Sequence, residues 1–295
     1  MVGTIRFPHL GISLSHVIRS VSIGGFEIAC YGMVLAAAMV TGLFLVMRLA
    51  RFTGQDEDSY FDFGMIVILV SVICARIYYV VFSWDYYRVH PSEILNLREG
   101  GLAIYGGVIG GALTAVIYSR IRKKNLLQLL DTAAVGLAWG QMVGRWGNFF
   151  NREAFGGYTD NLFAMQLPLD DVRSWEVTQE MLDHTEIIDG VSYIQVHPTF
   201  LYESLWNLGV VLILLFLILK VKKQFFGRAF FTYLLLYGIG RAWIEGLRTD
   251  QLWIPGTEIP VSQLLSVLFA IAGGISLFLL SRKSKKKPVG ENNRK

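Results

Sequence analysis

The chain has 295 residues, of which 53% are hydrophobic and 17% charged, and its formal net charge is +4 at pH 7. A mean hydropathy of +0.46 is too high for an ordinary water-soluble domain of this length, so the composition excludes that class and indicates an integral membrane protein. The lysines and arginines form short clusters beside apolar runs, which is typical of topology signals and argues against a nucleic-acid partner.

Seven apolar segments are long enough to cross a bilayer, which takes about 20 helical residues. We therefore predict an all-α polytopic membrane protein in which residues 1–295 form a single membrane-embedded domain. The segments run from Ile28 to Met47, Phe61 to Phe82, Leu102 to Tyr118, Asp131 to Phe149, Phe200 to Leu219, Phe230 to Gly246 and Val261 to Leu280. The two cysteines, Cys30 and Cys74, lie inside apolar segments and are interpreted as packing residues.

The charges between these segments predict an orientation. Lysines and arginines follow the first, third, fifth and seventh segments, so those loops belong in the cytoplasm, with the N-terminus outside and the C-terminus inside. Residues 151–199 are rich in acids and become an extracytoplasmic insertion or cap between helices four and five. Residues 281–295 form a basic cytoplasmic tail, interpreted as an orientation signal; binding of anionic lipid is the alternative.

Arginines occur inside three of the predicted membrane helices, at Arg76, Arg145 and Arg241. Each precedes the outer end of its segment by four to six residues, so at 1.5 Å per residue all three lie about 6 to 9 Å below that end. Any one of them is explained by snorkelling or by pairing with an acid, but their common depth favours one functional site. Because guanidinium stays protonated and presents a planar pair of donors, we predict an anion site, with a phospholipid phosphate as the ligand.

Other polar residues lie near the same predicted membrane surface. Asn148 shares a helical face with Arg145, whereas Asn151 and Glu153 do not, so we expect the helix to end near Phe149 and the backbone to turn. The remaining members of this group are Tyr31, Tyr105, His197, Tyr202, Glu203, Glu245 and Arg248. The tyrosines also fit an aromatic interface belt, and His197 also fits a hydrogen-bonding residue at a helix entry.

Glycines recur at four-residue intervals in the third and fourth segments, a spacing that lets helix backbones approach closely in lipid. They are Gly106, Gly107, Gly110 and Gly111, and then Gly136, Gly140 and Gly144. We find no metal-binding constellation and no nucleotide-binding glycine motif in the chain.

The stretch from Gly144 to Glu153 resembles the signature of the phosphatidylglycerol–prolipoprotein diacylglyceryl transferase family. The similarity covers essentially the whole chain and extends to Tyr31-Gly32, Gly101 to Gly111, His197-Pro198, Leu201 to Glu203, and Arg241 with Glu245 and Arg248. The resemblance implies a multi-pass protein of the bacterial cytoplasmic membrane (the inner membrane) with seven helices and an active site that opens outward.

The resemblance also implies an activity, which is the first step of bacterial lipoprotein maturation. The diacylglyceryl group of phosphatidylglycerol would move to the lipobox cysteine thiol of a prolipoprotein signal peptide, giving a thioether and glycerol phosphate, with no cofactor or metal. Arg145, Arg241, Tyr105 and Glu245 would be catalytic, the two arginines by binding phosphate and stabilising the leaving group. The substrate-binding residues would be Tyr31, Arg76, Asn148, Asn151, Glu153, Gly156, His197, Tyr202, Glu203 and Arg248.

One position departs from much of the family, where histidine stands in place of Tyr105 and is a candidate base for the thiol. A tyrosine hydroxyl, with an ordinary pKa of about 10, is a poor base for a thiol of about 8.5. Tyr105 is therefore a base only if nearby arginines lower its pKa, and the assignment of the base stays open. The alternative is that Tyr105 hydrogen-bonds the lipid and that Glu203, Glu245, the departing phosphate or water accepts the thiol proton.

Two other classes remain open. A phospholipid or anion transporter would also place arginines in a helix bundle, but it favours paired repeats and a site near the midplane, and the seven segments show no two-half symmetry. A membrane protein that binds lipid without transferase activity is the second alternative.

Overall fold

The computed structural model describes residues 3–97, 100–221 and 225–286. The chain divides into two compact units, which comprise Met1–Gly42 with Ala134–Lys295, and Leu43–Ala133. The divisions fall inside the helices α1 (Cys30–Phe52) and α5 (Leu126–Asn151).

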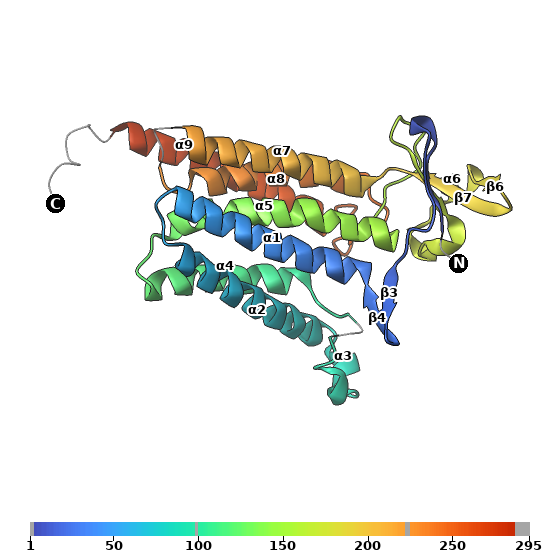
Figure 1. The fold of residues 1–295 in the computed structure, drawn as a ribbon, viewed down its shortest axis with the longest axis horizontal. Helices are drawn as coiled ribbons and strands as arrows, with labels where there is room; N and C mark the ends of the chain where they lie inside the picture. The colour runs from blue at the N-terminus through green and yellow to red at the C-terminus, as the bar shows by residue number, and fades with distance from the viewer. Residues whose placement is uncertain (1–2, 98–99, 222–224, 287–295) are drawn as a thin grey trace. The chain divides into compact units, whose positions relative to one another are not determined.

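Six helices among the described residues are long and apolar enough to cross a membrane (Figure 1). They are α1, α2 (Glu57–Phe82), α4 (Ile104–Ile121), α5, α7 (Thr199–Lys220) and α9 (Val261–Lys286). The prediction of a polytopic helical membrane fold is confirmed. The remaining predicted segment, Phe230 to Gly246, forms α8 (Arg228–Glu245), which is not among these six and carries the charged side chains of Arg228, Arg241 and Glu245.

Two small β-sheets accompany the helices and were not predicted. A five-stranded antiparallel sheet has the order β2-β1-β5-β7-β6, and a separate hairpin pairs β3 (Ser20–Ile23) with β4 (Phe26–Ala29). The five strands are β1 (Ile5–Phe7), β2 (Ile12–Leu14), β5 (Met165–Pro168), β6 (Glu186–Ile188) and β7 (Val191–Val196). The insertion between α5 and α7 is thus completed by strands from the N-terminal segment.

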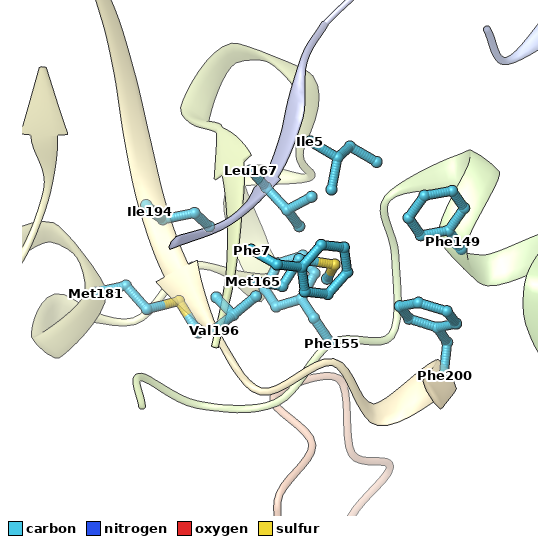
Figure 2. Close-up of a cluster of buried hydrophobic side chains, with 10 residues drawn as sticks. All are labelled: Ile5, Phe7, Phe149, Phe155, Met165, Leu167, Met181, Ile194, Val196 and Phe200. Atoms are coloured by element: carbon cyan, nitrogen blue, oxygen red, sulfur yellow. The ribbon is translucent and has the colours of Figure 1, made fainter. Parts of the chain in front are cut away.

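Apolar side chains from distant parts of the chain form the core of this sheet (Figure 2). Ile5 of β1, Leu167 of β5 and Ile194 of β7 are fully buried. Phe149 near the end of α5 and Phe200 at the start of α7 join the same cluster, with ring centroids 4.9 Å apart. The sheet is therefore packed on the ends of two membrane helices, which holds the segment between α5 and β5 in place.

The shorter elements lie in the connections. Two short α-helices are α3 (Trp84–Tyr87) and α6 (Gln179–Asp183). Four 3-10 turns occupy Pro8–Leu10, Pro91–Glu93, Leu169–Asp171 and Ser174–Glu176.

Helix α5 contacts three neighbours within its compact unit. Trp139 donates to Thr41 of α1 at 2.9 Å, Trp146 donates to Ser204 of α7 at 3.2 Å, and Gln141 donates to Tyr233 of α8 at 2.8 Å. Helix α8 also packs against both α7 and α9 (Figure 1). A side chain on α5 can therefore reach partners on α7 and α8, which is where the acidic residues of the site lie.

Helices α2 and α4 pack closely in the other unit because α4 presents glycines to α2. A Cβ placed on Gly106 would lie 2.6 Å from the Cβ of Tyr78 and 2.9 Å from the Cα of Ala75. The next residue, Gly107, has room, since its nearest neighbour would be the Ser71 carbonyl oxygen at 3.6 Å. The predicted role of these glycines in helix packing is confirmed at Gly106.

We expect Gly106→Ala to destabilise the protein by about 1–3 kcal/mol, because the added methyl meets backbone and Cβ atoms that cannot rotate away. Thermal unfolding of the purified protein in detergent micelles measures the effect. Gly107→Ala is the matched control and should unfold at the parent temperature. Equal losses for the two variants would contradict this account of the helix contact.

Candidate active site

Glu203, on the second turn of α7, lies at the centre of the candidate site. Its side chain is 4% exposed, and its two oxygens face different arginines. Oε2 lies 2.7 Å from Nε of Arg145 on α5, and Oε1 accepts from Nη1 of Arg241 on α8 at 2.7 Å. A third guanidinium, that of Arg248 just after α8, has Nη1 3.8 Å from Oε1. One carboxylate thus ties three segments together.

Two further acids balance the arginines. Glu245 lies one helical turn after Arg241, and its Oε2 is 2.5 Å from Nη2 of that arginine. Asp250 accepts two hydrogen bonds from Arg248, at 2.8 Å from Nε and 2.5 Å from Nη2. Burial alone would raise the pKa of Asp250, but these bonds outweigh it and the pKa is lowered. Three arginines therefore face three carboxylates, so the cluster carries no large net charge.

The arginines differ in how many donors they have left. Arg241 has one Nη bound to each glutamate and its side chain is only 12% exposed. Arg145 is 22% exposed, donates Nη1 to Asn148 at 3.2 Å, and has no partner for Nη2 among the described residues. Because its other end is fixed by Glu203, Arg145 presents an oriented and accessible edge of its guanidinium, which suits one oxygen of a phosphate or carboxylate.

The end of α5 brings the predicted amide and carboxylate groups together. Asn148 and Asn151 both donate to Oε1 of Glu153, at 3.0 and 3.3 Å. The helix continues to Asn151, two residues beyond the predicted end, and the backbone then turns sharply because Arg152 and Ala154 have φ of 53° and 58°. Glu153 lies between these two residues and points back toward the helix. The turn was predicted, but not its unusual conformation.

Gly156 and His197 act through their backbones. Gly156 N–H donates to the His197 carbonyl at 3.0 Å, and Gly157 N–H donates to the Leu247 carbonyl at 2.9 Å, next to Arg248. A Cβ on Gly156 would lie 2.8 Å from both the Cβ of His197 and the Leu247 carbonyl oxygen, so only glycine permits this approach. The imidazole ring of His197 lies beside the hydroxyl of Tyr202. Burial lowers the pKa of His197.

The predicted tyrosines lie in different surroundings. The ring of Tyr31 packs on Gly147 of α5, where a Cβ would come within 2.7 Å of it. Tyr202 accepts a hydrogen bond from Asn161 at 3.0 Å and stacks near Trp243, with ring centroids 6.2 Å apart. Tyr105 is the second residue of α4 in the other compact unit, with its ring centroid 6.5 Å from that of Tyr78.

Arg76, also in the other unit, does not have the environment predicted from its depth. Its side chain is buried, and all five of its N–H groups donate to backbone carbonyls. The acceptors are Glu93, Ile94, Asn96, Gly100 and Gly101, at 2.6 to 3.1 Å. Every donor is engaged within the connection between α2 and α4, so the arginine shapes that connection and has no N–H left for an anion.

Arg173 of the insertion joins the site and was not predicted. Its Nη2 lies 2.6 Å from Oε2 of Glu153, and its Nη1 donates to Glu176 at 3.3 Å. Burial raises the pKa of Glu176, opposed by hydrogen bonds from Arg173 and the Ala154 N–H. The only sequence signal was an isolated arginine in an acid-rich stretch, which does not reveal its partner.

A polar pocket of about 220 Å³ adjoins this pair. It is lined by Arg19, Asn151, Glu153, Asp170, Asp171, Val172 and Arg173. In the described part of the chain, no group of three His, Cys, Asp or Glu side chains is arranged to hold a metal ion.

The fold and the site together define a multi-pass membrane protein with a buried arginine–carboxylate network. Residues 19–279 match the family model described as prolipoprotein diacylglyceryl transferase. The chain therefore belongs to the prolipoprotein diacylglyceryl transferase family.

Curated relatives agree with the family model, and each is called phosphatidylglycerol–prolipoprotein diacylglyceryl transferase. The protein from Clostridioides difficile (strain 630) is 41% identical over 261 residues, covering 88% of this chain and 94% of the relative. The Clostridium novyi (strain NT) protein is 40% identical with coverages of 88% and 95%. The Bacillus cytotoxicus protein is 39% identical over 249 residues, with coverages of 84% and 86%.

We expect Glu203→Ala to lower the free energy of unfolding by about 3–5 kcal/mol, because it leaves buried arginines without their shared carboxylate. Denaturant-induced unfolding in detergent micelles measures the loss. Asp85→Ala is the control, since Asp85 is 93% exposed and its one ion pair among the described residues is with Arg88. An unchanged midpoint for Glu203→Ala would show that the network contributes little to the fold.

Proposed function

We propose that the protein transfers the diacylglyceryl group of phosphatidylglycerol to the lipobox cysteine thiol of prolipoproteins. The thiol sulfur would form a bond to the terminal glycerol carbon of the lipid, the bond from that carbon to the phosphate oxygen would break, and glycerol phosphate would leave with the bonding electrons. Membership of the family supports the reaction. The single observation that carries it in the structure is the accessible, pre-oriented edge of Arg145.

Arg145 would bind the lipid phosphate and stabilise the charge that grows on it as the bond breaks. Such donors contribute most when they are fixed before the reaction and need not reorganise. Glu203 supplies that fixation by holding Nε of Arg145 at 2.7 Å, while Arg241 is held between Glu203 and Glu245. Arg241 would act by fixing Glu203 and by its positive charge close to the phosphate.

The thiol proton needs an acceptor. Both oxygens of Glu203 already lie 2.7 Å from arginine nitrogens, so it is a poor base, and one oxygen of Glu245 lies 2.5 Å from Nη2 of Arg241. The departing phosphate gains negative charge during the step and remains beside Arg145, so we propose it as the acceptor, directly or through water. Tyr105 would then hydrogen-bond the lipid.

The expected location and orientation follow the same proposal. The protein would lie in the bacterial cytoplasmic membrane with its N-terminus and the insertion 151–199 outside and the basic tail 281–295 in the cytoplasm. Residues 287–295 of that tail lie outside the described residues. The basic loops after α1, α4 and α7 support this orientation.

Incubation of the purified protein with phosphatidylglycerol and a lipobox peptide tests the reaction. Mass spectrometry should detect a thioether-linked diacylglyceryl peptide and free glycerol phosphate. If lipid binds but no modified peptide forms, the alternative of a lipid-binding protein without transferase activity is favoured.

Arg145→Lys should lower turnover in this assay by at least about 100-fold, because lysine keeps the charge but loses the planar edge that meets both Glu203 and the phosphate. Arg88→Lys is the matched control, since Arg88 is 60% exposed and, in the part of the chain that the structure describes, forms an ion pair with Asp85 alone. The turnover of this variant should equal the parent rate. Near-normal turnover of Arg145→Lys would contradict the assignment of Arg145 to the phosphate.

A further inference from the structure

We propose that Arg173 is a positioning residue that orients Glu153 and, through Glu153 and Asn148, the guanidinium of Arg145. This inference rests on the proposed transferase function and adds a residue of the insertion to it. Arg173 would not touch the substrate's reacting atoms. It would act by fixing the carboxylate on which the amide groups at the end of α5 depend.

The contacts form one continuous path from the insertion to the arginine. Nη2 of Arg173 lies 2.6 Å from Oε2 of Glu153, and Oε1 of the same carboxylate accepts from Asn148 at 3.0 Å. The carbonyl oxygen of the Asn148 side chain accepts from Nη1 of Arg145 at 3.2 Å. Because an amide that donates at one end to a fixed carboxylate cannot flip freely, its oxygen stays directed at Arg145.

Arg173 is itself held in place. Its Nη1 donates to Glu176, whose side chain is fully buried and whose other oxygen accepts from the Ala154 N–H at 3.0 Å. Glu153 sits between Arg152 and Ala154, two non-glycine residues with positive φ, a conformation that persists only when its surroundings enforce it. The Arg173 and Glu176 side chains provide contacts on both sides of that turn.

The exposure of the pair separates positioning from simple stabilisation. The side chain of Arg173 is 51% exposed, so water screens its ion pairs with Glu153 and with the buried Glu176 and reduces what they add to the stability of the fold. Glu153 and Asn151 line a polar pocket, where water competes for the carboxylate once Arg173 is removed. Loss of Arg173 should therefore leave the protein folded and Glu153 poorly oriented.

A double-mutant cycle tests this path. Arg173→Gln, Glu153→Gln and the double variant are compared with the parent protein for kcat and KM in the transfer assay and for thermal unfolding. We expect Arg173→Gln to lower kcat/KM about tenfold at an unchanged unfolding temperature. In the Glu153→Gln background the same change should have less than about a twofold effect, since coupled residues are not additive.

Two further variants sharpen the cycle. Arg173→Lys keeps a cation within reach of Glu153 and should recover most of the lost activity. Arg19→Gln removes a similarly exposed arginine whose ion pair is with Asp171, not Glu153, and its effect should be the same in both backgrounds. If Glu153→Gln has no measurable turnover, the cycle is measured on lipid binding instead. The amount of phosphatidylglycerol that each purified variant retains then shows whether the effects of the two substitutions are additive.

The outcomes separate this inference from the function on which it rests. An active parent protein with unchanged Arg173→Gln kinetics, or with additive effects in the cycle, would overturn the role of Arg173 and leave the transferase proposal standing. A fall in unfolding temperature that matches the loss of activity would also overturn it. A parent protein that forms no modified peptide would instead overturn the proposed function.

Discussion

The site depends on the ion pairs that the carboxylate of Glu203 forms with Arg145 and Arg241. Three arginines brought together in a low-dielectric environment repel one another, and a single buried acid that contacts two of them directly and approaches the third makes the arrangement tenable. The same contacts connect α5, α7 and α8, so charge balance and helix packing have one origin. Glu203 contacts Nε of Arg145 and Asn148 accepts from Nη1, so Nη2 has no partner among the described residues.

Much of this site was readable from the sequence because charges inside apolar segments are conspicuous. Arg145 and Arg241 could be predicted as site residues from their depth in the membrane, Glu245 from its position near the same predicted surface, and the amides near the end of α5 from the expected turn. Arg76 is also a charge inside an apolar segment, but it does not join the other two arginines in the site. Its depth matched that of the other arginines, but only coordinates show that nearby carbonyls take all its donors.

The insertion was the least predictable part. Its strands are only three to six residues long and pair with N-terminal residues far away in the sequence, and such short segments carry little periodic signal. Arg173 was missed for the same reason, since its partner Glu153 is recognisable only once the turn at Arg152 and Ala154 is known. Local pattern thus identified the helices, whereas long-range pairing decided how the polar residues outside them meet.

The pairing of β1 with β5 has a consequence for biogenesis. Arg6 lies opposite Gln166, so the hairpin of β1 and β2 has no β5 to pair with until four long helices and the first part of the insertion have been synthesised. Contacts this distant in sequence form late and slowly. The Glu153 turn packs on the same sheet through Phe155, so a ribosome-bound chain that stops before β7 lacks an ordered site. Assembly of the candidate site is thereby delayed until most of the membrane helices have been synthesised.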